Sequence, residues 1–188
     1  MKNFETSLRN LTIAPYIVKA TALIGIQRKS GSNMFRHQIS TFGILLDYKI
    51  TDPVVLKAAL IHDLFEDAGN MPGVTEDEIK KLDADGPAVY DLVMEVSIRR
   101  IPGGGKEPKS EFLLRIMKSN NMRAKVLKLA DRISNVESLG FVHDLIFVKK
   151  YIQETKDLIL PFAQSINADM YKELFDLVEN RSKMIIGM

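Results

Sequence analysis

The chain has 188 residues and a net charge of +2, with 26 basic and 24 acidic side chains mixed along its length. A chain of this size buries about 70% of its unfolded surface, which is enough for one domain with a real core. The absence of cysteine excludes a disulfide framework, a zinc finger and a thiol nucleophile. No apolar run approaches the roughly 18 residues of a membrane span, the first residues lack a signal-peptide apolar region, and the mixed charges form no polybasic face. We therefore expect a soluble cytoplasmic protein that binds neither nucleic acid nor membrane.

The first third of the chain predicts helices separated by short loops. Asp52 is a good N-cap and Pro53 suits the first helical position, so a strongly apolar central helix begins there. Gly69 is expected to end this helix as its C′ glycine. From the spacing of apolar residues we predict helices at residues 11–14, at 16–26 after Pro15, at 39–46 and at 53–68, with a basic loop at 28–33.

The rest of the chain continues the helical pattern. Thr75 and Glu78 form a capping box that opens a short helix, and Gly86 starts another that runs to about residue 97. The loop at residues 98–108 has three glycines, two prolines and three cationic side chains; it is either a solvated connector or a basic lid over an anionic ligand. Alternating strand patterns are missing, so we predict an all-α single domain over residues 1–188. Further helices are predicted at residues 110–118 with Ser110 as N-cap, at 123–139, at 145–160 with Pro161 at its end, and at 168–178.

Four ionisable residues interrupt the apolar pattern of the central helix. On a continuous helix, residues four apart are stacked neighbours, so His62 would lie over Glu66 and Asp63 over Asp67. The surrounding apolar residues would bury most of this helix, and unpaired carboxylates there would be costly. A divalent cation would offset that cost, and histidine with aspartate is a workable ligand pair. The alternative is a helix with an incidental exposed polar face.

A second polar anomaly lies in the predicted helix at residues 123–139. Asp131 and Asn135 are four residues apart, so they lie on the same side of the helix. Asp131 also borders the apolar face of that helix. A buried aspartate there is a second candidate metal ligand. Alternatively, it forms a helix-surface ion pair with Lys128 or Arg132.

The order of these residues resembles a known superfamily. A histidine, then a His-Asp pair, then a distant aspartate on separate helices is similar to the HD phosphohydrolase superfamily. Further segments resemble the hydrolase domain of RelA/SpoT alarmone enzymes, with a match from about residue 26 to 139. The predicted C-terminal helices at 145–180 follow this motif-bearing core. The short chain looks most like the stand-alone small alarmone hydrolases. The residues that carry the resemblance are Arg28-Lys29-Ser30-Gly31 nine residues before His37, His62-Asp63 followed by Glu66-Asp67, and Lys128 to Arg132 with Asn135 beyond.

The resemblance implies a helical HD-domain bundle and an enzyme that removes pyrophosphate from the 3′ position of guanosine tetra- or pentaphosphate, leaving GDP or GTP. It implies a small nucleotide as substrate and one divalent metal, Mn²⁺, and it leaves a homo-oligomer open. The implied metal ligands are His37, His62, Asp63 and Asp131. The implied catalytic pair, which orients and deprotonates the attacking water, is Glu66 and Asp67. The residues implied to surround the guanosine and its ribose are Arg28, Lys29, Ser30, Asn135 and Ser138.

Several positions depart from the family pattern. The family often has tyrosine at the position of Met34 and proline at that of Gln38, and it differs around Ser138. Two other interpretations therefore stay open: an HD-type hydrolase of another nucleotide, such as an adenosine analogue or NADPH, and a non-catalytic nucleotide-binding module. We do not expect a second metal site at His143, because it follows a helix boundary and Asp144 suits the N-cap of the next helix.

Overall fold

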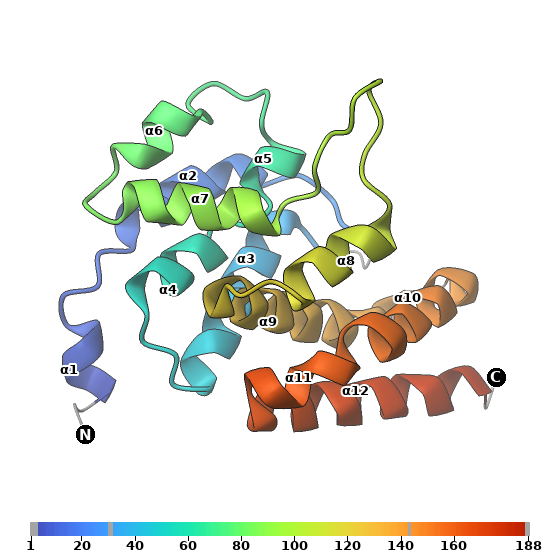
Figure 1. Cartoon of the computed structure of the whole chain (residues 1–188). Coiled ribbons are helices and arrows are strands. Elements are labelled where there is room, and N and C mark those ends of the chain that lie inside the picture. Colours follow the sequence, from blue (N-terminus) through green and yellow to red (C-terminus); the bar gives the residue numbers. More distant parts are fainter. Residues whose placement is uncertain (1–3, 30–31, 143, 187–188) are drawn as a thin grey trace. The chain divides into compact units, whose positions relative to one another are not determined.

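The computed structural model describes residues 4–29, 32–142 and 144–186. Within these ranges the regular elements are helices, accompanied by two isolated β-bridges, so the prediction of an all-α fold is confirmed (Figure 1). None of the described helices is long and apolar enough to cross a membrane. The chain divides into two compact units, one made of Met1–Gln27 and Asn33–Ser97 and the other of Arg28–Ser32 and Ile98–Met188.

The first unit carries the central apolar helix. Its helix α4 packs against α3 and α7, and α6 covers another part of α7. All residues from Val54 to Ala59 are buried, and the Asp52 carboxylate accepts the N–H groups of Val54 and Val55, as its N-cap role predicts. The helices of this unit are α1 Phe4–Leu8, α2 Ala14–Ala20, η1 Thr21–Leu23, α3 Met34–Asp47, α4 Pro53–Ala59, α5 Leu64–Asp67, α6 Glu76–Lys80 and α7 Gly86–Val96.

The central helix is interrupted, which corrects the prediction of one helix from Pro53 to Gly69. Helix α4 ends at Ala59 and α5 begins at Leu64, with a turn between them. The His62 ring Nδ1 lies 2.8 Å from the Ala59 carbonyl, which in a continuous helix would accept the N–H of residue 63. His62 therefore lies in the turn and Glu66 in α5, so the continuous helix on which the stacking of this pair was predicted is absent. Asp63 is the N-cap of α5, and its carbonyl accepts the Asp67 N–H at 3.0 Å.

A partly buried charge cluster connects several elements of the first unit. The Lys57 ammonium is 2.7 Å from Asp83 and 2.6 Å from Asp85, and the Tyr16 hydroxyl donates to Asp83 at 2.8 Å. Burial alone would lower the pKa of Lys57, but its two carboxylate partners outweigh this and raise the pKa. Burial likewise acts to raise the pKa of Asp83, and the bonds from Lys57 and Tyr16 outweigh it and lower the pKa. The cluster ties α2 and α4 to the turn before α7.

The second unit is built around the long helix α9. Helix α9 packs against α8, α11 and α12, and α10 packs against α8, α11 and α12 (Figure 1). The Arg132 guanidinium, only 1% exposed, binds the Glu154 carboxylate at 3.0 Å and lies 4.3 Å from the centre of the Tyr151 ring. The helices of this unit are α8 Lys109–Met117, α9 Met122–Ser138, η2 Leu139–Phe141, α10 Leu145–Leu158, α11 Leu160–Ile166 and α12 Ala168–Ile186.

Several predicted boundaries need correction. The helix predicted to reach residue 26 ends as α2 at Ala20 and continues only as a short 3₁₀ turn, and α1 was missed. Ser110 is not a cap, because α8 already begins at Lys109 after Pro108. Pro161 lies in the first turn of α11, where a helix tolerates proline because the N–H groups there have no intrahelical acceptor. Helix α12 extends to Ile186 instead of ending near residue 178.

The glycine-rich loop at residues 98–108 is more ordered than a plain connector. Arg100 and Lys106 form an antiparallel bridge, and the Ile101 N–H donates to the Gly105 carbonyl at 2.9 Å. Gly103 and Gly104 both have positive φ, which lets the chain turn tightly at the tip. The loop is therefore a small hairpin-like turn that presents cationic side chains.

Candidate active site

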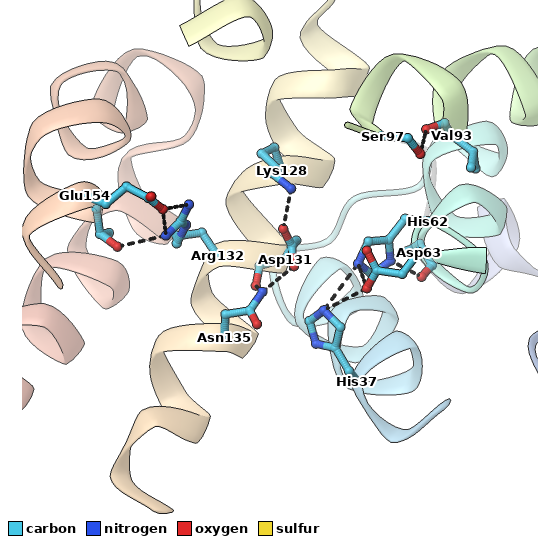
Figure 2. Close-up of polar contacts among 12 residues, drawn as sticks. His37, His62, Asp63, Val93, Ser97, Lys128, Asp131, Arg132, Asn135 and Glu154 are labelled. Atoms are coloured by element: carbon cyan, nitrogen blue, oxygen red, sulfur yellow. Dashed lines mark hydrogen bonds and ion pairs between the residues drawn. The ribbon is translucent and has the colours of Figure 1, made fainter. Parts of the chain in front are cut away.

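Three predicted metal ligands converge in the first unit. His37 comes from the first turns of α3, and His62 and Asp63 come from the turn between α4 and α5 (Figure 2). The Nε2 atoms of His37 and His62 are 3.3 Å apart, and Asp63 Oδ2 lies 3.5 Å from the first and 3.2 Å from the second. Both histidines are nearly fully buried. One ligand atom from each residue falls within 4.8 Å of the others, the arrangement of a partial metal-binding shell.

The chemistry of these donors fits a divalent cation. The Ala59 carbonyl can only accept a hydrogen bond, so the Nδ1 atom of His62 carries the proton. The lone pair of the neutral ring is then on Nε2, which faces His37 and Asp63. A backbone carbonyl that fixes the tautomer in this way is the usual second partner of a metal-binding histidine. Two imidazole nitrogens with a carboxylate oxygen suit Mn²⁺, Fe²⁺ or Zn²⁺ better than Ca²⁺.

The two predicted catalytic carboxylates lie immediately beyond these ligands. Glu66 and Asp67 form the last turn of α5, where Glu66 is half-buried and Asp67 is exposed. The N–H groups of both residues bond to the Asp63 carbonyl, at 3.2 and 3.0 Å. The short helix α5 therefore fixes both backbone positions relative to Asp63.

Asp131, the fourth predicted ligand, belongs to the second unit. It is 5% exposed on α9 and pairs with the Lys128 ammonium at 2.8 Å, while the Asn135 amide donates to the Asp131 backbone carbonyl at 2.9 Å (Figure 2). The burial that was expected of a ligand is present. The ion pair with Lys128, which was the alternative prediction, is also present, but this pair is buried and does not lie on the helix surface. The ligand role of Asp131 stays a prediction.

Arg28, from the basic loop at residues 28–33, contacts Asn135 of α9 within the second unit. The Arg28 guanidinium donates to Asn135 Oδ1 at 2.6 Å, and the Arg28 N–H donates to the Ser32 carbonyl at 2.8 Å. The Lys29 ammonium lies 4.7 Å from the centre of the Phe147 ring. Arg28 and Asn135, which are 107 positions apart in the sequence, therefore form one polar surface.

The other predicted residues have varied outcomes. Ser138 donates its hydroxyl to the Asn135 carbonyl at 2.9 Å, so that hydroxyl closes the end of α9. Ser30 and His143 lie outside the described residues. Asp144 accepts the Phe147 N–H at 3.0 Å, as its predicted N-cap role requires. Sequence reasoning missed Gln38 as part of the site; the only signal was its departure from the proline that is frequent there.

The helical fold and the His, His-Asp arrangement define a protein of the HD type. A family model described as the HD domain matches residues 15–168, which includes segments of both units. The chain therefore belongs to the HD domain family.

Curated relatives and a solved structure narrow the similarity. The chain is 30% identical over 156 residues to the GTP pyrophosphokinase rsh of Brucella abortus, an alignment that covers 80% of this chain and 20% of that protein. It is 34% identical over 104 residues to a guanosine-3′,5′-bis(diphosphate) 3′-pyrophosphohydrolase of Drosophila melanogaster, covering 55% of this chain and 54% of that one. A solved structure of a metazoan ortholog of SpoT that hydrolyses ppGpp superposes with a TM-score of 0.74 at 25% identity, covering 89% of this chain and 96% of the other. The chain thus spans about a fifth of the long bacterial relatives and about half of the Drosophila protein.

Proposed function

We propose that this chain hydrolyses the 3′-pyrophosphate of guanosine tetra- or pentaphosphate, so that water and the nucleotide give pyrophosphate and GDP or GTP. The observation that carries the proposal is the convergence of His37, His62 and Asp63 on one point of the first unit. It is supported by the relatives from Drosophila melanogaster and Vibrio cholerae, both named as 3′-pyrophosphohydrolases of guanosine-3′,5′-bis(diphosphate).

We propose Mn²⁺ as the cation, and His37, His62, Asp63 and Asp131 as the residues that would hold it. When bound, a divalent cation would supply Lewis acidity, which lowers the pKa of water to about 7 and neutralises charge on a phosphoryl oxygen. The His62 ring is held for this task by its bond to the Ala59 carbonyl. This bond leaves Nε2 of His62 as the atom that would bind the cation.

Glu66 and Asp67 are the proposed proton carriers. They follow Asp63 within one turn of helix, and their backbone N–H groups bond to the Asp63 carbonyl, which supports this role. One accepts a proton from the attacking water, and one returns a proton to the 3′ oxygen as the bond to phosphorus breaks. The net reaction consumes one water and leaves a 3′ hydroxyl.

Arg28, Lys29 and Asn135 are proposed to bind the guanosine. Arg28 offers a planar cation that can stack on a purine, and its bond to Asn135 fixes the orientation of that plane. Ser30 and Ser138 are proposed to border the ribose. These residues would bind the nucleoside, whereas the reacting phosphate would be bound at the metal site.

Phosphorus NMR of a nucleotide panel with Mn²⁺ present tests the proposal. The wild type should release pyrophosphate and GDP from guanosine tetraphosphate, and a chelator should stop the reaction. The variant Asp63→Asn should be inactive, whereas Asp91→Asn, an exposed aspartate on α7, should behave as wild type. Phosphate release from NADPH or an adenosine nucleotide without pyrophosphate release from guanosine tetraphosphate would refute the substrate. A wild type that binds Mn²⁺ but cleaves no nucleotide would refute hydrolysis itself.

A further inference from the structure

Gln38 makes a two-point contact with the ligand Asp63. Gln38 is fully buried on α3, directly after His37. Its side-chain Nε2 donates to Asp63 Oδ2 at 3.0 Å, and its Oε1 lies 3.5 Å from the Asp63 backbone nitrogen as acceptor. Both contacts require the same orientation of the amide, because a flipped amide would set oxygen against carboxylate and NH₂ against N–H. The amide NH₂ of Gln38 therefore faces the Asp63 carboxylate, and the amide oxygen faces the Asp63 backbone N–H.

The helix break explains why Asp63 uses such a partner. The Ala59 carbonyl, which would accept the Asp63 N–H in an unbroken helix, is bonded to the His62 ring instead. Asp63 is the N-cap of α5 in position, yet its side chain makes no cap bond to that helix. Its Oδ2 atom lies close to the Nε2 atoms of His37 and His62.

We propose that Gln38 is a positioning residue for Asp63, which holds Oδ2 against the two histidine nitrogens and so preorganises the metal centre. The proposal rests on the proposed metal site. A carboxylate oxygen has two lone pairs, so Oδ2 can accept the amide N–H and still coordinate a cation. Because the amide fixes Oδ2 in place, Asp63 offers the cation one defined oxygen. Groups that orient a metal ligand in this way typically contribute about 10- to 100-fold in metal affinity.

The helix α3 provides a matched control. Thr41 is also fully buried on α3, one turn beyond His37, and its hydroxyl has no hydrogen-bond partner among the described residues. The variant Thr41→Val therefore removes a buried polar group of the same helix without breaking a contact. Two variants of Gln38 break the contact in different ways: Gln38→Met keeps the length and removes both polar ends, whereas Gln38→Asn keeps the amide and shortens its reach.

The test is the dissociation constant for Mn²⁺, measured on metal-free protein by calorimetry and by the electron paramagnetic resonance signal of unbound Mn²⁺. Both Gln38→Met and Gln38→Asn should weaken binding by about 10- to 100-fold, and Thr41→Val should bind as wild type. Circular dichroism and thermal unfolding of the metal-free proteins show that each variant is folded. If Gln38→Met fails to fold, the shorter Gln38→Asn decides the question.

Three outcomes would overturn the proposal. Wild-type affinity in the folded Gln38 variants would mean that the amide does not position Asp63. An equal loss in Thr41→Val would mean that affinity follows the packing of α3 in general. A wild type that binds no Mn²⁺ would remove the metal centre and this inference together. In the first two cases pyrophosphate release by the wild type would persist, so the proposed function would stand without the role of Gln38.

Discussion

The bond between Arg28 and Asn135 offers a quantitative test of how the nucleoside is recognised. The two side chains meet at 2.6 Å, and both are half-buried. Asn135 is itself anchored, because its amide donates to the Asp131 carbonyl at 2.9 Å. We therefore expect Arg28→Ala and Asn135→Ala to damage the same feature, which is the orientation of the guanidinium plane. Each change should raise the KM for guanosine tetraphosphate more than it lowers kcat, the signature of lost uniform binding.

The magnitude follows from the kind of bond. A hydrogen bond to a charged group contributes about 1.5 to 3 kcal/mol, and about 1.4 kcal/mol corresponds to a factor of ten. The coupling in a double-mutant cycle of Arg28 and Asn135 should therefore be about 10- to 100-fold in kcat/KM. The double variant should be little worse than the poorer single variant, because either change alone already breaks the bond.

Steady-state kinetics on guanine and adenine nucleotides measures this cycle. The matched control is Arg9→Ala, which removes an exposed arginine with the same change of charge. Additive effects of Arg28→Ala and Asn135→Ala would refute the coupling. A collapse of kcat at unchanged KM in Arg28→Ala would mean that this residue acts on the reacting phosphate, which reverses the proposed placement of the substrate.

Two further predictions concern catalysis and pH. Glu66→Gln and Asp67→Asn should each lower kcat by about 10² to 10⁴ while Mn²⁺ titrations stay normal, and near-wild-type turnover in both would remove the pair from the mechanism. Asp83→Asn should lose about 2 kcal/mol of stability at pH 7, where the Asp83 carboxylate bonds to Lys57. Because folding lowers the pKa of Asp83 below its ordinary 3.8, this contribution is present above that pH and disappears as the pH falls through the folded value. Urea unfolding from pH 7 to 3 checks the sign, and a difference between wild type and variant that stays constant to pH 3 would contradict it.

Side-chain caps identified three helix starts from the sequence, although the start of α3, at Met34 and not at residue 39, was predicted wrongly. Asp52, Thr75 and Asp144 all cap the helices that they were expected to cap. Such a cap is a bond between a side chain and an N–H two or three residues away, so the sequence encodes it directly. Helix α12 packs against α9, α10 and α11, which is a long-range property, and its end at Ile186 was predicted too early, near residue 178.

The break between α4 and α5 could not be predicted from the apolar pattern. The residues from Leu60 to Leu64 are buried or half-buried, so the apolar pattern of the sequence runs through the break without a change that would mark it. The bond from His62 to the Ala59 carbonyl decides the conformation, because it replaces a helical hydrogen bond with a side-chain one. The prediction that His62 and Asp63 belong to one site does not depend on this error, since adjacent residues stay close in either conformation.

Asp131 illustrates why a buried carboxylate by itself does not identify a metal ligand. The Lys128 ammonium bonds to its Oδ2 and the Asn135 amide to its Oδ1, so donors from the same helix compensate the buried charge. Asp63 has different neighbours, because its Oδ2 faces two imidazole nitrogens, which are themselves ligands for divalent cations. The spacing of residues along a helix predicts that a carboxylate is buried, but not which groups from other segments surround it. The metal site is therefore best defined where three potential ligands from two segments meet, at His37, His62 and Asp63.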